Sequence, residues 1–254
     1  MIEIDKDIYQ RSSELSNRIM IPNSVCIIGV GGVGGWVAFK FPLLGINNII
    51  LIDPDTLEES NLNRLPYKYD QIGEYKVHAM QELIRERRMC NVQALPMKWE
   101  DIPQVERDNI TNENGSNTSI IIDCRDTITP LEGVTDSYIT GGYDGTSVTI
   151  HTSPNFNNVW GEDQVGYRIT PSYLIPPDLI STLIINFICY EMHQDASLLD
   201  ETVLTFDVGK LLGIIKRGVR VVDEGPLVEA LDNGVIDKCP SKKRKKSKQP
   251  TIEQ

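Results

Sequence analysis

The chain has 254 residues, of which 40% are hydrophobic and 24% charged, a length that suffices for one large α/β domain whose core needs no disulfides. Its formal net charge of −11 at pH 7 is typical of a poor general nucleic-acid binder, because contacts to phosphates require clustered Lys and Arg. No apolar run approaches the roughly 18 residues that cross a bilayer, so we expect a cytoplasmic protein with no membrane contact.

The predicted elements alternate between helices and strands from the beginning of the chain. Residues 1–20 predict a helix that carries Arg11 and Arg18, and "SVCIIGV" predicts a buried strand. A glycine turn and a helix that closes at Gly45 come next. "NNIILID" predicts a second buried strand that ends on Asp53, "EYKVHAMQELIRERR" predicts a helix, and "NVQALPMKW" predicts a strand.

The second half of the chain continues the alternation. "TSIIIDCRD" predicts a strand that ends in acidic residues, and "GTSVTIHTS" alternates as a strand does. An irregular connection over 153–176 leads to the apolar helix "DLISTLIINFICYEM", and the remainder suggests a strand or two and a short helix. We expect one domain over 1–239 and a basic, disordered tail over 240–254.

This order of elements predicts an α/β fold with a Rossmann-like doubly wound, mostly parallel sheet and helices on both faces. In such sheets ligands bind at the carboxyl ends of the strands. The residues that come after the predicted strands are therefore the first candidates for a functional site.

A glycine cluster lies after the first predicted strand. Gly29, Gly31 and Gly34 fit the pattern G-x-G-x-x-G, and Gly32 lies in the same turn, where backbone amides at a helix N-terminus face an anion. Asp53 lies 19 residues beyond Gly34, at the end of the next strand, where an acidic residue takes ribose hydroxyls. These features indicate an adenine nucleotide but leave NAD and ATP open, and glycines used only for tight packing are the structural alternative.

Polar residues beyond the second strand favour ATP over NAD. Asn61, Arg64 and Lys76 come after the ribose-binding acid, and a triphosphate needs such a set of donors to its β- and γ-phosphates. A hard metal ion is then required, and Asp126 and Asp123 are available at the end of the strand "IIID".

Four motifs together resemble a known family. "GVGGVGG", "IDPDTLEESNLNR", "IGEYK" and "DCRD" are similar, in order and spacing, to the motifs of the ThiF/MoeB/HesA superfamily, the adenylating fold of ubiquitin-activating enzymes. The resemblance is strong over residues 25–127 and thinner after them. It implies an ATP-binding adenylation domain over 1–239, and an adenylyltransferase, a nucleotidyltransferase that activates carboxylates.

The resemblance also implies roles for single residues. Asp53 and Asp55, which form the D-x-D segment, would bind the nucleotide, with Asp53 on the ribose. Asn61 and Arg64 would contact the phosphates, and Lys76 would contact the β- and γ-phosphates. The glycines of the turn would complete the nucleotide site.

The resemblance implies catalysis by alignment and charge neutralisation. Asp126 would bind Mg²⁺, and in a homodimer Arg11, or Arg18 as second choice, would reach the ATP of the other subunit. With Arg64 and Lys76 these residues form the expected catalytic set. The substrate's own carboxylate, expected to be the C-terminal glycine of a ubiquitin-like or sulfur-carrier protein, would attack the α-phosphate to form acyl-AMP and pyrophosphate.

The sequence also departs from the family. It lacks the two C-x-x-C pairs of many relatives, so no structural zinc is expected. Thr127 stands where the family commonly has Asn, and Pro130 interrupts the helix expected after "DCRD". Residues 153–176 contain no cysteine, so we expect no thioester, with Cys239 as the only mobile thiol.

Two other functions are compatible with the sequence. One is a tRNA-modifying dehydratase that adenylates a nucleoside carboxylate, and the other is a non-catalytic partner subunit. The acidic body argues against nucleic acid, whereas the tail "KKRKK" could contact it or serve as a nuclear address.

Overall fold

The computed structural model describes residues 21–111, 120–126, 131, 134, 138–145, 147–152, 172–191, 203–208, 219–221 and 236–238. The chain forms two compact units, Met1–Asp207 and Val208–Gln254. In the second unit β8 (Val219–Val221) pairs antiparallel with β9 (Ile236–Lys238). The predicted N-terminal helix and the predicted tail lie outside the described residues, and the domain boundary at residue 239 stays a prediction.

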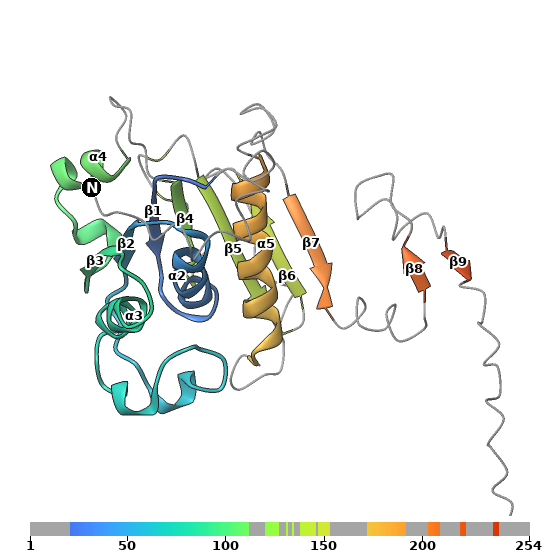
Figure 1. Ribbon diagram of the computed structural model, residues 1–254, viewed down its shortest axis with the longest axis horizontal. Helices are drawn as coiled ribbons and strands as arrows, with labels where there is room; N and C mark the ends of the chain where they lie inside the picture. The colour runs from blue at the N-terminus through green and yellow to red at the C-terminus, as the bar shows by residue number, and fades with distance from the viewer. Residues whose placement is uncertain are drawn as a thin grey trace, which may run out of the picture. The chain divides into compact units, whose positions relative to one another are not determined.

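The first unit is built on a mostly parallel sheet, as the alternation of elements predicts (Figure 1). Its strands are β1 (Ser24–Ile28), β2 (Asn48–Ile52), β3 (Asn91–Leu95), β4 (Ile120–Asp123), β5 (Tyr138–Asp144), β6 (Ser147–His151) and β7 (Val203–Asp207). Over the described residues they lie in the order β3-β2-β1-β4-β5-β6-β7. Neighbours from β3 to β5 are parallel, and β6 and β7 are antiparallel additions. The order reverses between β1 and β4, which is where doubly wound sheets bind ligands.

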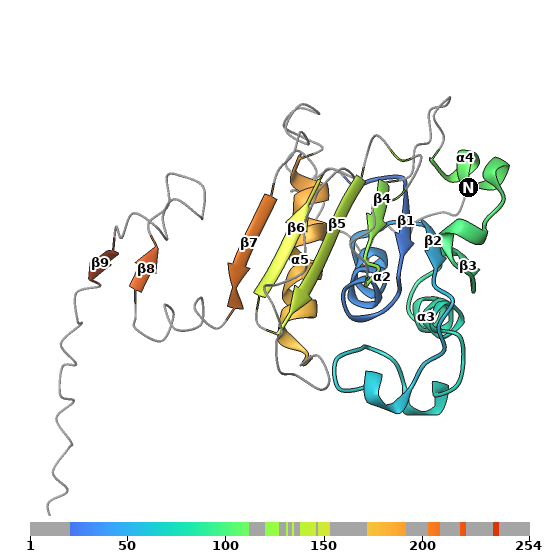
Figure 2. The same ribbon diagram turned by 180° about the vertical axis from the view of Figure 1, so that it is seen from behind.

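Helices cover the sheet. They are α2 (Gly32–Leu44), α3 (Lys76–Arg85), α4 (Gln104–Thr111) and α5 (Ile175–Glu191), with short 3-10 helices η1 (Glu59–Asn61), η2 (Tyr69–Gln71) and η3 (Trp99–Asp101). Both views place α2 and α5 side by side over one face (Figures 1 and 2). The predicted doubly wound α/β fold is therefore confirmed.

The apolar pattern of the strands explains why both faces are covered. Cys26 and Ile28 are fully buried in β1 and pack with Trp99, Ile102 and Ile110 from η3, α4 and the turn between them. Because side chains alternate along a strand, the other residues of β1 face the opposite side of the sheet. A nearly continuous apolar strand is typical of a parallel sheet that is buried on both faces.

The end of α2 agrees with the sequence. Gly45 adopts a left-handed conformation with φ of 102°, and its N–H donates to the carbonyl groups of Phe41 and Pro42. Glycine suits this position because it has no Cβ to clash in that conformation.

No helix in the part of the chain that the structure describes combines the length and apolar character needed to span a membrane.

Strand β5 was not predicted. Its sequence "YITGGYD" contains adjacent glycines that are typical of a turn, yet β5 pairs with β4 on one side and β6 on the other. One of these glycines is required for packing, because a Cβ on Gly141 would lie 2.6 Å from Cδ1 of Ile184 in α5. Pairing and close helix packing here outweigh the low strand propensity of glycine.

Candidate functional site

One cavity of about 670 Å³ opens where the strands of the sheet end. Its walls come from the segments after β1, β2, β3 and β4, from the end of β5, and from a residue shortly before α5. This is the edge at which the sequence places its candidate residues. The predicted residues that line the cavity are Gly29, Gly31, Gly32, Asp53, Asp55, Arg64, Lys76 and Asp126.

The glycines of the turn have different surroundings. Gly29 has φ of +83°, and a Cβ there would lie 2.7 Å from the carbonyl oxygen of Cys124. Gly31 has no neighbouring atom within 4 Å of the position of a Cβ and lines the cavity. Gly34 is not among the lining residues, and a Cβ there would lie 1.8 Å from the carbonyl oxygen of Gly29. Gly34 therefore allows the helix to pack against the turn, while Gly31 leaves space beside the backbone.

Asp53 is fixed at the base of the cavity. It is only 5% exposed, and its two carboxylate oxygens accept hydrogen bonds from the N–H groups of Val30, at 2.6 Å, and Asp55, at 2.8 Å. Burial raises the pKa of Asp53, and the Lys76 charge and the two N–H groups oppose that effect only in part. Two backbone bonds thus hold the carboxylate in one orientation between β2 and the glycine turn.

Lys76 and Asp55 form an ion pair in the cavity wall. The Lys76 Nζ lies 2.7 Å from Oδ2 of Asp55, and the Lys76 N–H donates to the Asp55 carbonyl at 2.9 Å. The lysine side chain is 12% exposed and the aspartate 63% exposed. A phosphate in the cavity could therefore replace Asp55 as the partner of the Lys76 ammonium group, because the Asp55 carboxylate is well solvated.

Arg64 and Asn61 stand in the loop after β2. The Nη1 group of Arg64 donates to the carbonyl of Ser60 and to Oδ1 of Asn63, both at 2.9 Å and both uncharged. The backbone carbonyl of Arg64 accepts a hydrogen bond from the Trp36 indole N–H at 2.7 Å, and this bond connects the loop to α2. Asn61 is not among the lining residues, and its side-chain oxygen accepts a hydrogen bond from the Glu58 N–H at 3.1 Å. In this structure Asn61 shapes the loop that carries Arg64.

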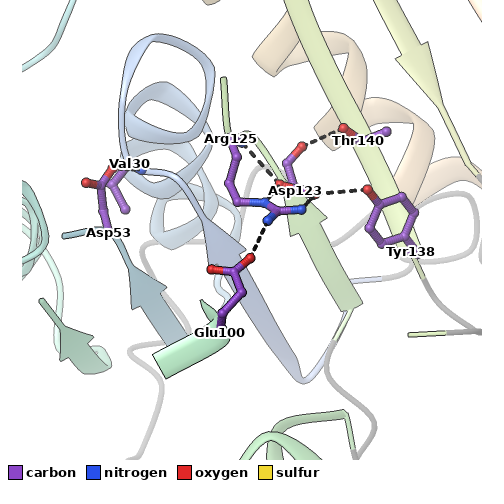
Figure 3. A network of polar contacts seen from close by, with 7 residues as sticks. All are labelled: Val30, Asp53, Glu100, Asp123, Arg125, Tyr138 and Thr140. Atoms are coloured by element: carbon purple, nitrogen blue, oxygen red, sulfur yellow. Dashed lines mark hydrogen bonds and ion pairs between the residues drawn. The ribbon is translucent and has the colours of Figure 1, made fainter. Parts of the chain in front are cut away.

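The two acids at the end of β4 have different environments. Asp123 is buried and accepts hydrogen bonds from Nε and Nη2 of Arg125, both at 2.9 Å, and from the Tyr138 hydroxyl at 3.0 Å (Figure 3). Its carboxylate is occupied by protein groups, which does not suit a metal ligand. Asp126 is exposed and lines the cavity. Of the two predicted metal candidates, only Asp126 offers a carboxylate to a ligand.

Arg125 and Glu100 are cavity residues that sequence reasoning missed. The Arg125 Nη1 donates to Glu100 at 2.8 Å, so the guanidinium joins η3 to the end of β4 (Figure 3). Burial alone lowers the pKa of Arg125, but the hydrogen bonds and charges of Asp123 and Glu100 outweigh burial and raise it. The signal was present in the "DCRD" motif, where a buried acid two residues before an arginine permits a bidentate pair.

Three predicted residues, Arg11, Arg18 and Cys239, lie outside the described residues. Within the described ranges, no group of three or more His, Cys, Asp or Glu side chains could hold a metal ion. A single carboxylate that shares a metal ion with phosphates would not form such a group.

The part of the chain that forms the cavity is similar in sequence to known proteins. Residues 18–135, which include the glycine turn and both acids of the "DCRD" motif, match the family model described as the ThiF family. The chain is 34% identical over 90 residues to ubiquitin-like modifier-activating enzyme 5 of Arabidopsis thaliana, a match covering 33% of this chain and 21% of the relative.

The chain is also similar to a second kind of protein. The chain is 33% identical over 108 residues to the tRNA threonylcarbamoyladenosine dehydratase of Escherichia coli K12, covering 42% of this chain and 38% of the relative. The chain thus spans less than half the length of either relative. Among solved structures it resembles E. coli MccB with AMPCPP and MccA, at a TM-score of 0.55 and 17% identity over 82% of this chain and 72% of MccB. That likeness shows the shared fold.

Proposed function

We propose that this chain is an ATP-dependent adenylyltransferase that activates a carboxylate, with the C-terminal glycine of a ubiquitin-like or sulfur-carrier protein as substrate. The observation that carries the proposal is one cavity, in a chain whose residues 18–135 match the ThiF family, that combines a glycine turn, a fixed acid at the end of β2 and the basic pair Arg64 and Lys76. An NAD site needs the first two features, whereas the basic pair suits a triphosphate.

The geometry supports distinct roles for these groups. Asp53, oriented by two backbone N–H groups, would accept hydrogen bonds from ribose hydroxyls. Arg64 and Lys76 would bind the phosphates, since Arg64 bonds only to uncharged oxygens here and Lys76 pairs with an exposed acid. Gly31 leaves room for a phosphate to approach the backbone.

The proposed reaction needs no nucleophile from the protein. A carboxylate oxygen of the substrate attacks the α-phosphorus of ATP, a bond forms between them, and the bond from that phosphorus to the bridging oxygen breaks to release pyrophosphate. Alignment and neutralisation of the phosphate charge are then the tasks of the protein. Lys76 and Arg64 would stabilise the leaving pyrophosphate.

The residues present fit a magnesium ion. Mg²⁺ is commonly held by one or two carboxylates together with substrate phosphates, and Asp126 is an exposed carboxylate in the cavity wall. Asp126 would hold the ion, which would supply charge neutralisation at the triphosphate. We further propose a cytoplasmic homodimer in which Arg11 completes the site of the other subunit.

A second candidate reaction shares the same cavity. The match to the tRNA threonylcarbamoyladenosine dehydratase spans 108 residues of this chain, more than the 90 residues matched by the activating enzyme. This candidate would place a nucleoside carboxylate where the protein C-terminus is proposed. The acidic composition of the chain favours the protein substrate.

Two measurements test the proposal. Calorimetry should detect binding of ATP with Mg²⁺ and no comparable binding of NAD, and tight NAD binding without ATP binding would overturn the assignment. Exchange of labelled pyrophosphate into ATP should depend on an added ubiquitin-like protein that ends in Gly-Gly. Exchange that depends instead on threonylcarbamoyl-modified tRNA would establish the second candidate.

A further inference from the structure

Two hydroxyl groups line the cavity without a role in the proposed adenylation. Tyr143 lies near the end of β5, and Ser172 lies three residues before α5. Their hydroxyl groups are joined by a hydrogen bond. The carbonyl of Ser172 also accepts a hydrogen bond from Nδ2 of Asn63, at 3.1 Å, beside Arg64. The pair therefore links β5 to the loop that carries Arg64.

The Tyr143 hydroxyl faces the glycine turn. A Cβ on Gly32 would lie 2.8 Å from this hydroxyl oxygen, so the absence of a side chain at Gly32 makes room for it. Gly32 is the first residue of α2 and also lines the cavity. The hydroxyl pair is thus held next to the backbone where a phosphate would be cradled.

The sheet order places this pair on one side of the proposed nucleotide. Asp53 and Asp55 come after β2, the glycine turn comes after β1, and Tyr143 lies near the end of β5, beyond β4. A nucleotide with its ribose at Asp53 and its α-phosphate at the glycine turn has its ribose on the β2 side. The β5 side remains for the group that attacks the α-phosphate.

The pair has one proton to give. Two hydroxyl groups carry two protons, and their mutual hydrogen bond uses one of them, whichever atom is the donor. The other proton is available to an acceptor in the cavity. A neutral donor would orient one oxygen of a carboxylate without forming an ion pair, which leaves the other oxygen nucleophilic.

We propose that the Tyr143–Ser172 hydroxyl pair binds one oxygen of the substrate carboxylate and aims the other at the α-phosphate. This inference rests on the proposed adenylation. It makes Tyr143 and Ser172 substrate-binding residues for the acyl group and gives them no part in binding the nucleotide.

The test uses two probes and needs no knowledge of the natural substrate. AMP reports on the nucleotide site alone, and glycylglycyl sulfamoyl adenosine, a stable mimic of an acyl adenylate, adds the carbonyl oxygen that the pair would contact. Calorimetry on the full chain should show that Tyr143→Phe weakens binding of the acyl mimic about five- to tenfold, as loss of one hydrogen bond does. Binding of AMP should not change.

Three further variants make the result specific. Ser172→Ala should reproduce the loss, and the double variant should lose less than the product of the two single effects because the hydroxyls act as one unit. Tyr69→Phe deletes the same atom from a side chain that is 72% exposed and outside the cavity, and should leave both affinities unchanged. Thermal unfolding of each variant would confirm that it is folded.

The outcomes separate this inference from the proposed function. Equal weakening of AMP and of the acyl mimic would show that the pair serves the nucleotide and would overturn the inference, as would two unchanged affinities. If the unmodified chain binds neither AMP nor ATP, the proposed function itself fails. A loss of affinity for the acyl mimic alone supports both the inference and the proposed function.

Discussion

The two aspartates of the "DCRD" motif lie three positions apart along the chain and have different environments. Asp123 is the last residue of β4, is buried, and is bonded to Arg125 and Tyr138. Asp126 is exposed and lines the cavity. Removal of either carboxylate should therefore affect a different property of the protein.

We predict that Asp126→Ala abolishes pyrophosphate exchange and leaves the free energy of unfolding within about 0.5 kcal/mol of the original value, since it removes an exposed side chain. Loss of a ligand to a hard cation removes several kcal/mol of transition-state stabilisation. Exchange rates over a range of Mg²⁺ concentrations, together with urea unfolding, measure both effects. Near-normal exchange with an unchanged Mg²⁺ dependence would contradict the metal role.

We predict the opposite balance for Asp123→Ala. The substitution leaves the partly buried guanidinium of Arg125 without its bidentate partner, and breaking a buried pair in this way costs about 3–5 kcal/mol of stability. Urea unfolding should show this loss. Glu100→Ala is a matched control, because Glu100 is 58% exposed and an exposed pair contributes about 0–1 kcal/mol. Equal losses for the two variants would contradict the structural role of Asp123.

At the scale of elements, the glycine turn between β1 and α2 combines two requirements, close packing of the helix and open space in the cavity. Gly34 lets α2 begin against the carbonyl of Gly29, while Gly31 keeps the cavity open. The pattern alone leaves nucleotide binding and tight packing open for each of these glycines. The surroundings of each Cα show which glycine is needed for the fold.

We predict that Gly34→Ala destabilises the chain by more than about 3 kcal/mol, since its Cβ would lie 1.8 Å from a backbone oxygen that cannot move without displacing β1 or α2. Gly31→Ala should cost less than about 1 kcal/mol of stability and should still weaken ATP binding, because its Cβ would occupy open space in the cavity wall. Thermal unfolding and ATP calorimetry on both variants make the comparison. A stable Gly34→Ala variant that merely loses ATP would refute this division.

Much of the fold could be predicted from apolar runs and from the residues at which helices and strands end. The strand before the glycines, the helix that ends at Gly45 and the strand that ends before Asp53 were each predicted within a few residues. Strand β5 was missed because its stability comes from pairing with β4 and β6, which no local pattern records. The same holds for the site: Asp53 and Lys76 belong to local motifs, whereas Tyr143 and Glu100 reach the cavity only through long-range packing.

At the scale of the whole molecule, the proposed homodimer would bring a second copy of the chain to the site. The resemblance assigns Arg11 to the ATP of the other subunit, and this residue lies outside the described part of the structure. Oligomeric state and catalysis are therefore expected to be linked.

We predict a homodimer, seen by light scattering as twice the 28.6 kDa mass of the chain. Arg11→Ala should remain dimeric and lose pyrophosphate exchange, with Arg18→Ala as the matched control. An equimolar mixture of Arg11→Ala and Asp126→Ala chains, after subunit exchange, should regain about a quarter of full activity, because half of the dimers then hold one complete site. A monomeric mass, or no recovery on mixing, would contradict a site shared between subunits.

The distribution of thiols over the molecule decides whether the acyl group can pass from the adenylate to the enzyme. That transfer requires a reactive thiolate, and burial raises the pKa of Cys26 and Cys124 well above the ordinary range and those of Cys90 and Cys189 to about 11. Burial therefore disfavours the thiolate, the reactive form of cysteine, at all four of these positions. Cys239, outside the described residues, is the remaining candidate.

We predict that no thioester forms between this chain and its substrate. At pH 8 iodoacetamide should label Cys239 quickly and the other four cysteines only after unfolding, because a protonated thiol within the fold is a poor nucleophile. Mass spectrometry of the labelled peptides measures this order. A non-reducing gel of enzyme, ATP and a Gly-Gly protein should then show no adduct that thiols release. An adduct that disappears in Cys239→Ala would make the C-terminal segment catalytic, and one that persists there would place a reactive thiol in the folded domain despite its raised pKa.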